Sequence, residues 1–188
     1  KCRLSIEPGD THEIVGSLRA NMIDVAVTLE PEREPDFIFS PLFTDELMFL
    51  VNPKHTWAEA RRAVRADIPR EQYILYFRNS RTFEQIEDYF RAEQMVIKSV
   101  IDMGSMSAIK ELVKLGLGVT ILAPWVAQAE LAQKTMMALP LGRRKLKRQW
   151  GILHWKDRPM GWAEDTFIKL CQSVARQFAA RNGLRSHV

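Results

Sequence analysis

The sequence predicts an α/β fold, because stretches with the apolar pattern of strands alternate with amphipathic helical stretches along almost its whole length. Two nearly unbroken apolar runs, IDVAVTL at 23–29 and VTILA at 119–123, have the length of strands covered on both faces, which favours mainly parallel sheets. The chain has 188 residues, 46% of them hydrophobic and 27% charged, which is an ordinary globular composition with enough length for a sizeable core.

The first half of the chain is predicted to begin with a strand and a helix and to continue mainly as strands. Asp10 or Thr11 can cap the first helix, whose apolar residues recur at helical spacing. The loop EPEREPD and the pair Asn52-Pro53 interrupt the apolar runs that follow. The predicted elements are strand 3–7, helix 12–21, strand 23–29, strand FIFSPLF, strand 45–51, a helix-prone segment 57–72 and strand 73–77.

The second half alternates more regularly. Thr82 is the predicted cap of one helix, and Ser105 or Ser107 of the next. The last helix is predicted to turn one apolar stripe inward, made of Trp162, Phe167, Leu170, Val174 and Phe178. The predicted elements are helix 82–94, strand 96–101, helix 105–115, strand 119–123, helix 124–133, strand 136–141, strand 149–155 and helix 160–181.

A Gly-Leu-Gly sequence, Gly116 to Gly118, raises the question of a phosphate-binding loop. Such loops place their glycines after a strand and before a helix, where free N–H groups face the phosphate. Here the order is helix, glycines, strand. Gly116 therefore fits the left-handed residue that ends a helix, and Gly118 a tight entry into the strand. This pattern argues against a nucleotide-binding enzyme.

Charge, cysteine and histidine usage point to no particular partner or metal. The net charge of +4 and the isoelectric point of about 9.2 are too mildly basic to indicate nucleic acid alone. Cys2 and Cys171 are far apart and form no C-x-x-C pair, so we expect no metal site and no cofactor. No apolar run approaches the length of a membrane span. The histidines have no ligand-like spacing: they are His12, His55, His154 and His187.

No catalytic motif is present, and we predict no catalytic residue and no enzyme. Asp45 and Glu46 are adjacent in a predicted strand, so their side chains should point to opposite faces. The run RRKLKR at 143–148 has two interpretations, an anion or nucleic-acid contact and an exposed linker that returns to a strand.

The segment DMGSMSAIKEL at 102–112 is the stretch best suited to bind a small ligand. Gly104 allows a tight turn after a strand, and Ser105, Met106 and Ser107 then expose N–H and hydroxyl groups where a helix begins. Such a helix start can bind a carboxylate or sulfate. The alternative is that Ser105 or Ser107 only caps its own helix.

Four segments together resemble the effector-binding domain of LysR-type transcriptional regulators. They occur in the order of that family and at its spacing: LRANMIDVAVTL (18–29), PLFTDELMFLVNPKH (41–55), SMSAIKELVKLGLGVTILAPW (105–125) and RQWGILHWKD (148–157). The likeness covers nearly the whole chain. One departure is Asn21-Met22, where the family often has a Gly-Glu or similar pair.

The resemblance implies a type 2 periplasmic-binding-protein fold, with two α/β lobes joined by crossing hinge strands and an effector in the cleft between them. Lobe one would be 1–50 with 151–188, and lobe two 51–150. Relative to the family, the first strand and helix of lobe one are expected to be missing, as is the N-terminal winged helix-turn-helix that binds DNA.

By the same resemblance, the effector contacts would come from Thr28 in lobe one and from Asp102, Gly104, Ser105 and Met106 in lobe two. Asp102 would add negative charge to the cleft. We therefore expect an amide, an amine-bearing ligand or a metal-neutralised one rather than a plain dianion.

The implied function is effector sensing within a cytoplasmic, oligomeric transcription regulator, as a homodimer or homotetramer. DNA would be bound only through the missing domain. The helices at 12–22 and 105–115 would be candidate interface elements. The alternatives are an extracytoplasmic solute-binding protein of a transport system, which has the same fold, and an enzyme that reuses the cleft, for which the sequence nominates no residue.

Overall fold

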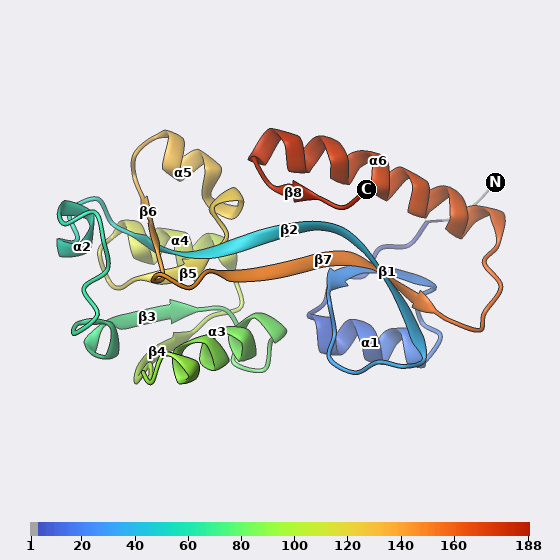
Figure 1. Ribbon diagram of the computed structural model, residues 1–188, viewed down its shortest axis with the longest axis horizontal. Coiled ribbons are helices and arrows are strands. Elements are labelled where there is room, and N and C mark those ends of the chain that lie inside the picture. The colour runs from blue at the N-terminus through green and yellow to red at the C-terminus, as the bar shows by residue number, and fades with distance from the viewer. Residues whose placement is uncertain (1–3) are drawn as a thin grey trace. The chain divides into compact units, whose positions relative to one another are not determined.

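The computed structural model describes residues 4–188, and the chain divides into two compact units (Figure 1). Among the described residues, one unit contains 4–45 and 148–188, and the other contains 46–147. The predicted lobe boundaries fall a few residues later in the chain than these. Two long strands continue from one unit into the other: β2 (Phe37–Val51) and β7 (Leu146–Trp155).

The first unit is a small sheet with one helix on each face. Its strands are ordered β1-β7-β2, and β8 joins the edge of β2. The helices α1 and α6 lie on opposite sides of β1 and β7 (Figure 1). The remaining elements of this unit are α1 (Thr11–Arg19), β1 (Val25–Leu29), α6 (Trp162–Asn182) and β8 (Arg185–Ser186).

Alternation along the strands explains why both faces of this sheet are apolar. Ala26 and Leu153 turn toward α1, whereas Ile152, the neighbour of Leu153, packs with Ala175 of α6. Four of the five residues of β1 are at least partly buried, as the apolar sequence predicts, whereas Val27 is 41% exposed. The prediction of mainly parallel sheets is nevertheless wrong, because β1 pairs with β7, and β2 with β5, β6 and β8, in antiparallel ladders.

The second unit is a sheet between α3 on one face and α4 on the other. The second half of β2 carries β5 and β6 on its two edges, and β3 pairs in parallel with β4 and, through Tyr73 and Val119, with the start of β5. The elements of this unit are α2 (Thr56–Glu59), η1 (Ile68–Arg70), β3 (Gln72–Leu75), α3 (Arg81–Ala92), β4 (Ser99–Asp102), α4 (Met106–Lys114), β5 (Thr120–Leu122), η2 (Pro124–Ala127), α5 (Gln128–Ala132) and β6 (Met137–Pro140).

The two faces of this sheet are filled by alternate residues of the same strands. Phe49 and Tyr73 belong to an aromatic cluster with Phe90 of α3, whereas their neighbours Leu50 and Ile74 pack against α4. Helix α3 follows β3 in the chain and α4 follows β4, and the two strands are parallel. The starts of both helices therefore lie at the carboxyl ends of these strands.

The helix ends confirm several sequence predictions. Asp10 caps α1 in a capping box with Glu13, and Ser105 caps α4. Gly116 has a φ of 77°, the left-handed conformation expected after a helix. A side chain at Gly118 would bring Cβ to 2.5 Å from the backbone oxygen of Gln72, so this position requires a close backbone approach.

Other elements differ from the prediction. FIFSPLF and DELMFLV form one continuous strand, β2. The predicted helix-prone segment 57–72 contains the last residues of α2, a short 3-10 turn and the first residue of β3. Residues 4–7 of the predicted first strand have no regular structure. Ser80 rather than Thr82 caps α3. The inward stripe predicted for α6 is wrong for Trp162, Leu170 and Val174, which are 79%, 59% and 54% exposed. Phe178 does pack inward, together with the small residues Ala175 and Ala179.

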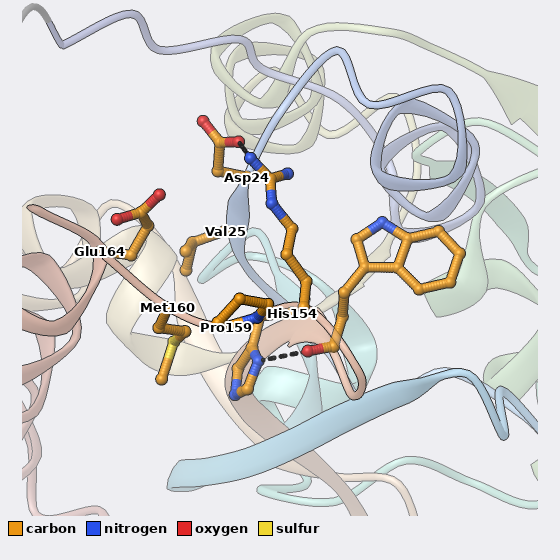
Figure 2. A pocket seen from close by; sticks show the side chains of 8 residues that line it. Asp24, Val25, His154, Pro159, Met160 and Glu164 are labelled. Carbon is orange, nitrogen blue, oxygen red and sulfur yellow. Dashed lines mark hydrogen bonds and ion pairs between the residues drawn. The ribbon is translucent and has the colours of Figure 1, made fainter. Parts of the chain in front are cut away.

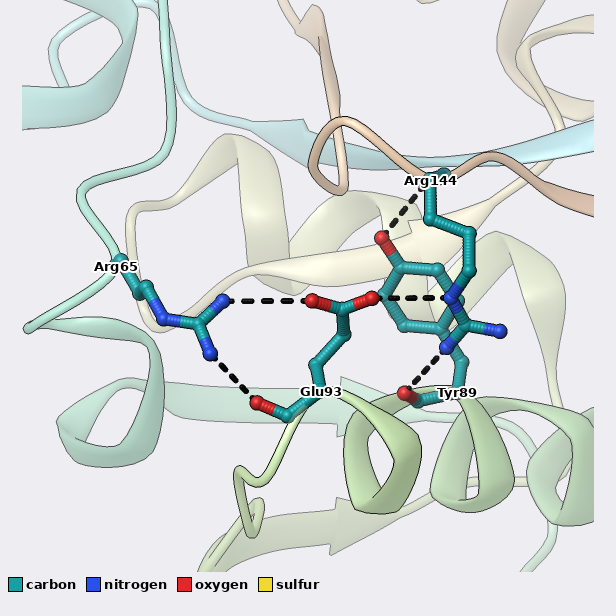
Figure 3. A network of polar contacts seen from close by, with 4 residues as sticks. All are labelled: Arg65, Tyr89, Glu93 and Arg144. Atoms are coloured by element: carbon teal, nitrogen blue, oxygen red, sulfur yellow. Dashed lines mark hydrogen bonds and ion pairs between the residues drawn. The ribbon is translucent and has the colours of Figure 1, made fainter.

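A polar network fixes the end of α3 to the turn before β7 (Figure 3). Glu93 accepts hydrogen bonds from Arg144, at 3.0 Å, and from Arg65, at 3.4 Å. The Tyr89 hydroxyl donates to the Arg144 backbone oxygen at 2.7 Å, and the guanidinium lies 4.2 Å from the ring centroid of Tyr89. The hydrogen bond from Arg144, aided by that from Arg65, holds the pKa of Glu93 below its ordinary value despite some desolvation.

This lowered pKa predicts a pH-dependent contribution to stability. A carboxylate whose pKa falls on folding stabilises the protein above its unfolded pKa, and the contribution is lost as the pH falls through the folded pKa. We expect Glu93→Gln to lower the urea midpoint at pH 7 and to flatten part of the acid-side decline. Glu87→Gln, on the exposed side of the same helix, is the control. An acid-side decline that is the same in Glu93→Gln and the wild type would contradict the assignment.

Candidate functional site

The carboxyl ends of β3 and β4 form the candidate site in the second unit. In sheets with parallel strands, ligands bind outside the carboxyl ends, where the following loops and helix starts converge. Here Leu75 pairs with Asp102 as the last residues of the two strands, and the Met103 N–H donates to the Leu75 backbone oxygen at 3.0 Å. The turn that enters α4 is thus fixed against the end of β3.

Gly104 fits this turn because an aromatic ring occupies the space beside it. A Cβ at this position would lie 2.3 Å from Cζ of Phe77, so a larger residue would displace the ring. Phe77 is 44% exposed and contacts Tyr76 at a centroid distance of 4.9 Å. The turn therefore offers an apolar ring next to exposed backbone.

The start of α4 supplies hydrogen-bond donors. Ser105 is exposed, and its hydroxyl accepts a hydrogen bond from the Ala108 N–H at 3.3 Å. The N–H groups of Met106 and Ser107 lie in the first turn, where a helix offers them no acceptor. Capping therefore occupies one acceptor site of Ser105, and a ligand could still accept from the helix start.

The helix α4 is held in place along its length. Lys110 forms an ion pair of 2.8 Å with Glu130 of α5 and donates to the Val126 backbone oxygen at 3.3 Å. Ile109 and Val113 are fully buried against the sheet. A firmly held helix keeps the donors at its first turn in one orientation, which favours ligand binding without a large ordering cost.

Four of the five predicted site residues lie together, and the fifth lies in the other unit. Asp102, Gly104, Ser105 and Met106 form the turn between β4 and α4, with Met106 partly buried and the others exposed. Thr28 belongs to the first unit, where it is only 2% exposed and its hydroxyl donates to Thr11 Oγ1 at 3.0 Å. Thr28 therefore contacts the start of α1, because Thr11 is the first residue of that helix.

Two residues of the candidate site were not predicted from the sequence. Phe77 lies two residues after the end of strand β3, and only the need for glycine at position 104 indicates its ring. Ser80 is fully buried and accepts from the Phe83 N–H at 3.2 Å, which places the start of α3 beside the turn after β3. The sequence gave no reason to prefer Ser80 over Thr82, two residues later, as the cap of this helix.

Among residues 4–188, no group of three or more His, Cys, Asp or Glu side chains is arranged to hold a metal ion. Burial raises the pKa of the Cys171 thiol, which opposes nucleophilic character. Cys2 lies outside the described residues. No helix within 4–188 is both long and apolar enough to cross a membrane.

The basic run at 143–148 is mostly engaged in contacts within the protein. Arg144 bonds Glu93 and Lys145 pairs with Glu46 at 2.8 Å. Arg148 is 6% exposed and pairs with Asp45. Arg143 and Lys147 are exposed. The run forms the turn and the first residues of β7, which favours the linker interpretation over a nucleic-acid surface.

Fold and sequence together define the class of protein. Residues 1–176 match the profile of the LysR substrate-binding domain, and the chain belongs to this family of effector-binding domains of transcription regulators. A curated relative is the HTH-type transcriptional regulator CfxR of Cupriavidus necator, 24% identical over 163 residues, which are 87% of this chain and 51% of the relative. The chain thus spans about half the length of this relative.

Solved structures show the same fold at low sequence identity. The effector-binding domain of QuiR, in complex with shikimate, superposes with a TM-score of 0.77 at 22% identity, over 90% of this chain and 79% of that one. The regulatory domain of CcmR from Synechocystis PCC6803, in complex with 2-PG, gives 0.76 at 20% identity, over 88% and 80%. The predicted two-lobe α/β fold is therefore confirmed.

Proposed function

We propose that this chain is the effector-sensing regulatory domain of a LysR-type transcription regulator. A small metabolite binds in the cleft between its two lobes and alters a DNA-binding winged helix-turn-helix that is not among these 188 residues. The observation that carries the proposal is that a chain of this family presents a glycine turn and a capped helix start at the carboxyl ends of β3 and β4. Control of this kind requires a ligand with different affinities for two arrangements of the domain.

The contacts proposed for lobe two suit a small polar molecule with one apolar face. The N–H groups at the start of α4 bind an acceptor oxygen, because the helix dipole favours negative charge there. The ring of Phe77, which lies beside Gly104, packs against carbon atoms. Asp102 at the end of β4 favours a ligand that also carries an amine or amide, or a metal-neutralised one, over a plain dianion.

In lobe one, the proposed contact is the start of α1 next to Thr28. Since the hydroxyl of Thr28 is buried and bonded to Thr11, its role is to orient that helix start rather than to expose a hydroxyl group. The relatives support small-molecule binding, because the QuiR domain was solved with shikimate and the CcmR domain with 2-PG. We further propose a homodimer or homotetramer, with α1 and α4 as candidate interface elements.

A metabolite panel followed by thermal unfolding tests this function. A ligand present at 100 times its dissociation constant should stabilise the domain by about 2.7 kcal/mol. We expect Ser105→Ala to reduce the ligand-induced shift at least severalfold. We also expect it to cost the free domain about 0.5–2 kcal/mol, because a helix cap is lost.

The matched control is Ser99→Ala, at the opposite end of β4, where the hydroxyl donates to Gln72 Oε1 at 2.6 Å. This variant should keep the full ligand-induced shift. A shift that survives in Ser105→Ala, or is lost equally in both variants, would place the site elsewhere.

A further inference from the structure

A third strand ends at the edge of the sheet that carries the candidate site. The pairing of Tyr73 with Val119 is parallel, so β5 runs in the same direction as β3 and β4. Its carboxyl end therefore lies at the same edge as theirs, and η2 and α5 follow it in the chain. The segment η2–α5 thus begins at the edge of the sheet where α4 also begins.

Lys110 of α4 is bonded to two points of this segment. Its Nζ forms an ion pair of 2.8 Å with Glu130 Oε1 of α5 and donates to the Val126 backbone oxygen of η2 at 3.3 Å. Lys110 follows Met106 by about one helical turn, which is about 6 Å along the axis. Side chains of a helix lean toward its N-terminus, so these bonds act close to the N–H donors of the candidate site.

Glu130 is compensated mainly by Lys110. The side chains of Lys110 and Glu130 are only 20% and 13% exposed. Desolvation opposes the ionisation of Glu130, but hydrogen bonds from Lys110 and from its own backbone N–H outweigh it and hold the pKa of Glu130 below its ordinary value. Within residues 4–188, the buried Oε2 of Glu130 accepts no hydrogen bond. The carboxylate therefore has a strong reason to stay with Lys110.

Two other ion pairs show the contrast with contacts that reach solvent. Asp24 and Arg158 pair at 2.8 Å at the edge of a small cavity that His154 also lines (Figure 2), and their side chains are 58% and 45% exposed. On α4 itself, Glu111 pairs with Lys114 at 2.6 Å, and Glu111 is 63% exposed. Water competes with contacts of this kind, so they restrict geometry only weakly.

The apolar contacts of α4 specify its position along its own axis less closely than the ion pair does. Ile109 and Val113 are fully buried against the sheet, but apolar attraction is non-directional. An ammonium group bonded to two acceptors depends on distance and angle. Ligand contacts need this precision, because a binding site loses quality when its groups are misplaced by more than about 0.5 Å.

We propose that Lys110 and Glu130 are positioning residues of the effector site. Their ion pair sets the place of the α4 start, and with it the affinity for an acceptor group of the ligand. The inference rests on the proposed function, because it assigns the pair a role toward that site. Replacing a buried ion pair by apolar side chains of similar size is often neutral for stability. Stability and affinity should therefore be separable at this pair, which a purely structural role would not allow.

A charge-balanced double replacement tests the proposal. Lys110→Met with Glu130→Leu removes the pair without changing the net charge, and we expect the thermal midpoint to stay within a few degrees of the wild type. In the free domain, the NMR signals of Gly104, which the adjacent ring of Phe77 shifts, should move because the turn is displaced.

Acetate is the probe for binding, at constant ionic strength. Its affinity, measured from the amide shifts of Ser105, Met106 and Ser107, should fall severalfold in the double variant. The matched control is Glu111→Leu with Lys114→Met, which removes a pair of the same charges within α4. This control should keep the Gly104 signals and the acetate affinity of the wild type.

A conservative variant decides the test if the double variant does not fold. Glu130→Gln keeps the shape of the side chain and one acceptor oxygen for Lys110, so it should move the Gly104 signals in the same direction by a smaller amount. Gly104 signals that stay in place in Glu130→Gln and in every folded double variant would overturn the inference.

Three further outcomes are decisive. Equal losses of acetate affinity in the Glu111–Lys114 control would overturn the inference, and so would a loss that appears only with a large fall in the thermal midpoint. A wild type that binds no acetate, together with displaced Gly104 signals in the double variant, would instead contradict the proposed binding site and support the positioning of α4 by the pair.

Discussion

Asp45→Asn is expected to destabilise the domain by about 3–5 kcal/mol, because it removes the carboxylate charge that faces the buried guanidinium of Arg148. The Asp45 side chain is fully buried, and Arg148 is bonded to both of its oxygens at 2.9 and 2.6 Å. The indole N–H of Trp150 donates to the same carboxylate at 3.0 Å. The substitution keeps the shape of the side chain, but it removes the charge and replaces one acceptor oxygen, which faces donors of Arg148 or Trp150, by an NH2 group that cannot accept.

Urea unfolding measures this effect, and the next residue provides a matched control. Glu46 pairs with Lys145 at 2.8 Å, but both side chains reach solvent, so Glu46→Gln should cost less than about 1 kcal/mol. Replacing the pair together, as Asp45→Leu with Arg148→Met, should recover most of the loss. Equal effects of Asp45→Asn and Glu46→Gln would show that the buried pair contributes little.

The second large effect is expected for Phe49→Ala, which should cost about 3–5 kcal/mol through lost burial and a residual cavity. Phe49 is fully buried, and its ring centroid lies 5.0 Å from that of Trp57, 6.1 Å from that of Phe90 and 6.4 Å from that of Tyr73. These rings join β2 to β3 and α3, so the substitution loosens the sheet whose carboxyl edge carries the candidate site.

The free energy of unfolding from urea titration checks this prediction. Phe77→Ala removes the same side chain type from a position that is 44% exposed, and it should cost about 1 kcal/mol. If Phe49→Ala cost no more than Phe77→Ala, the aromatic cluster would not be the main source of stability in the second unit.

Local signals in the sequence predicted the ends of helices well. Asp10 with Glu13, Ser105 and Gly116 act through hydrogen bonds or backbone conformations within a few residues, so their sequence context contains the needed information. Asp45 and Glu46 likewise point to opposite sides of β2, as strand alternation predicts. The turn at 102–106 was found because a glycine and a serine there meet the needs of a tight turn and a cap.

The predictions that were wrong concern features that depend on residues far apart in the sequence. An apolar run has the same sequence pattern whether the neighbouring strand is parallel or antiparallel. The run at 23–29 therefore led to a wrong prediction of the sheet type. Helix α6 has apolar residues on two faces, and close packing selected the face with Ala175 and Ala179. Phe77 gave no signal of its own, because its role comes from Gly104, which follows a different strand.

The central claim is that an effector binds at the turn between β4 and α4. The most direct measurement is an amide NMR titration of the wild-type domain with a stabilising metabolite from the panel. We predict saturable shifts that are largest at Gly104, Ser105 and Met106, with Phe77 also affected and Ser99 unchanged. Saturable binding that leaves these amides unmoved would contradict the claim.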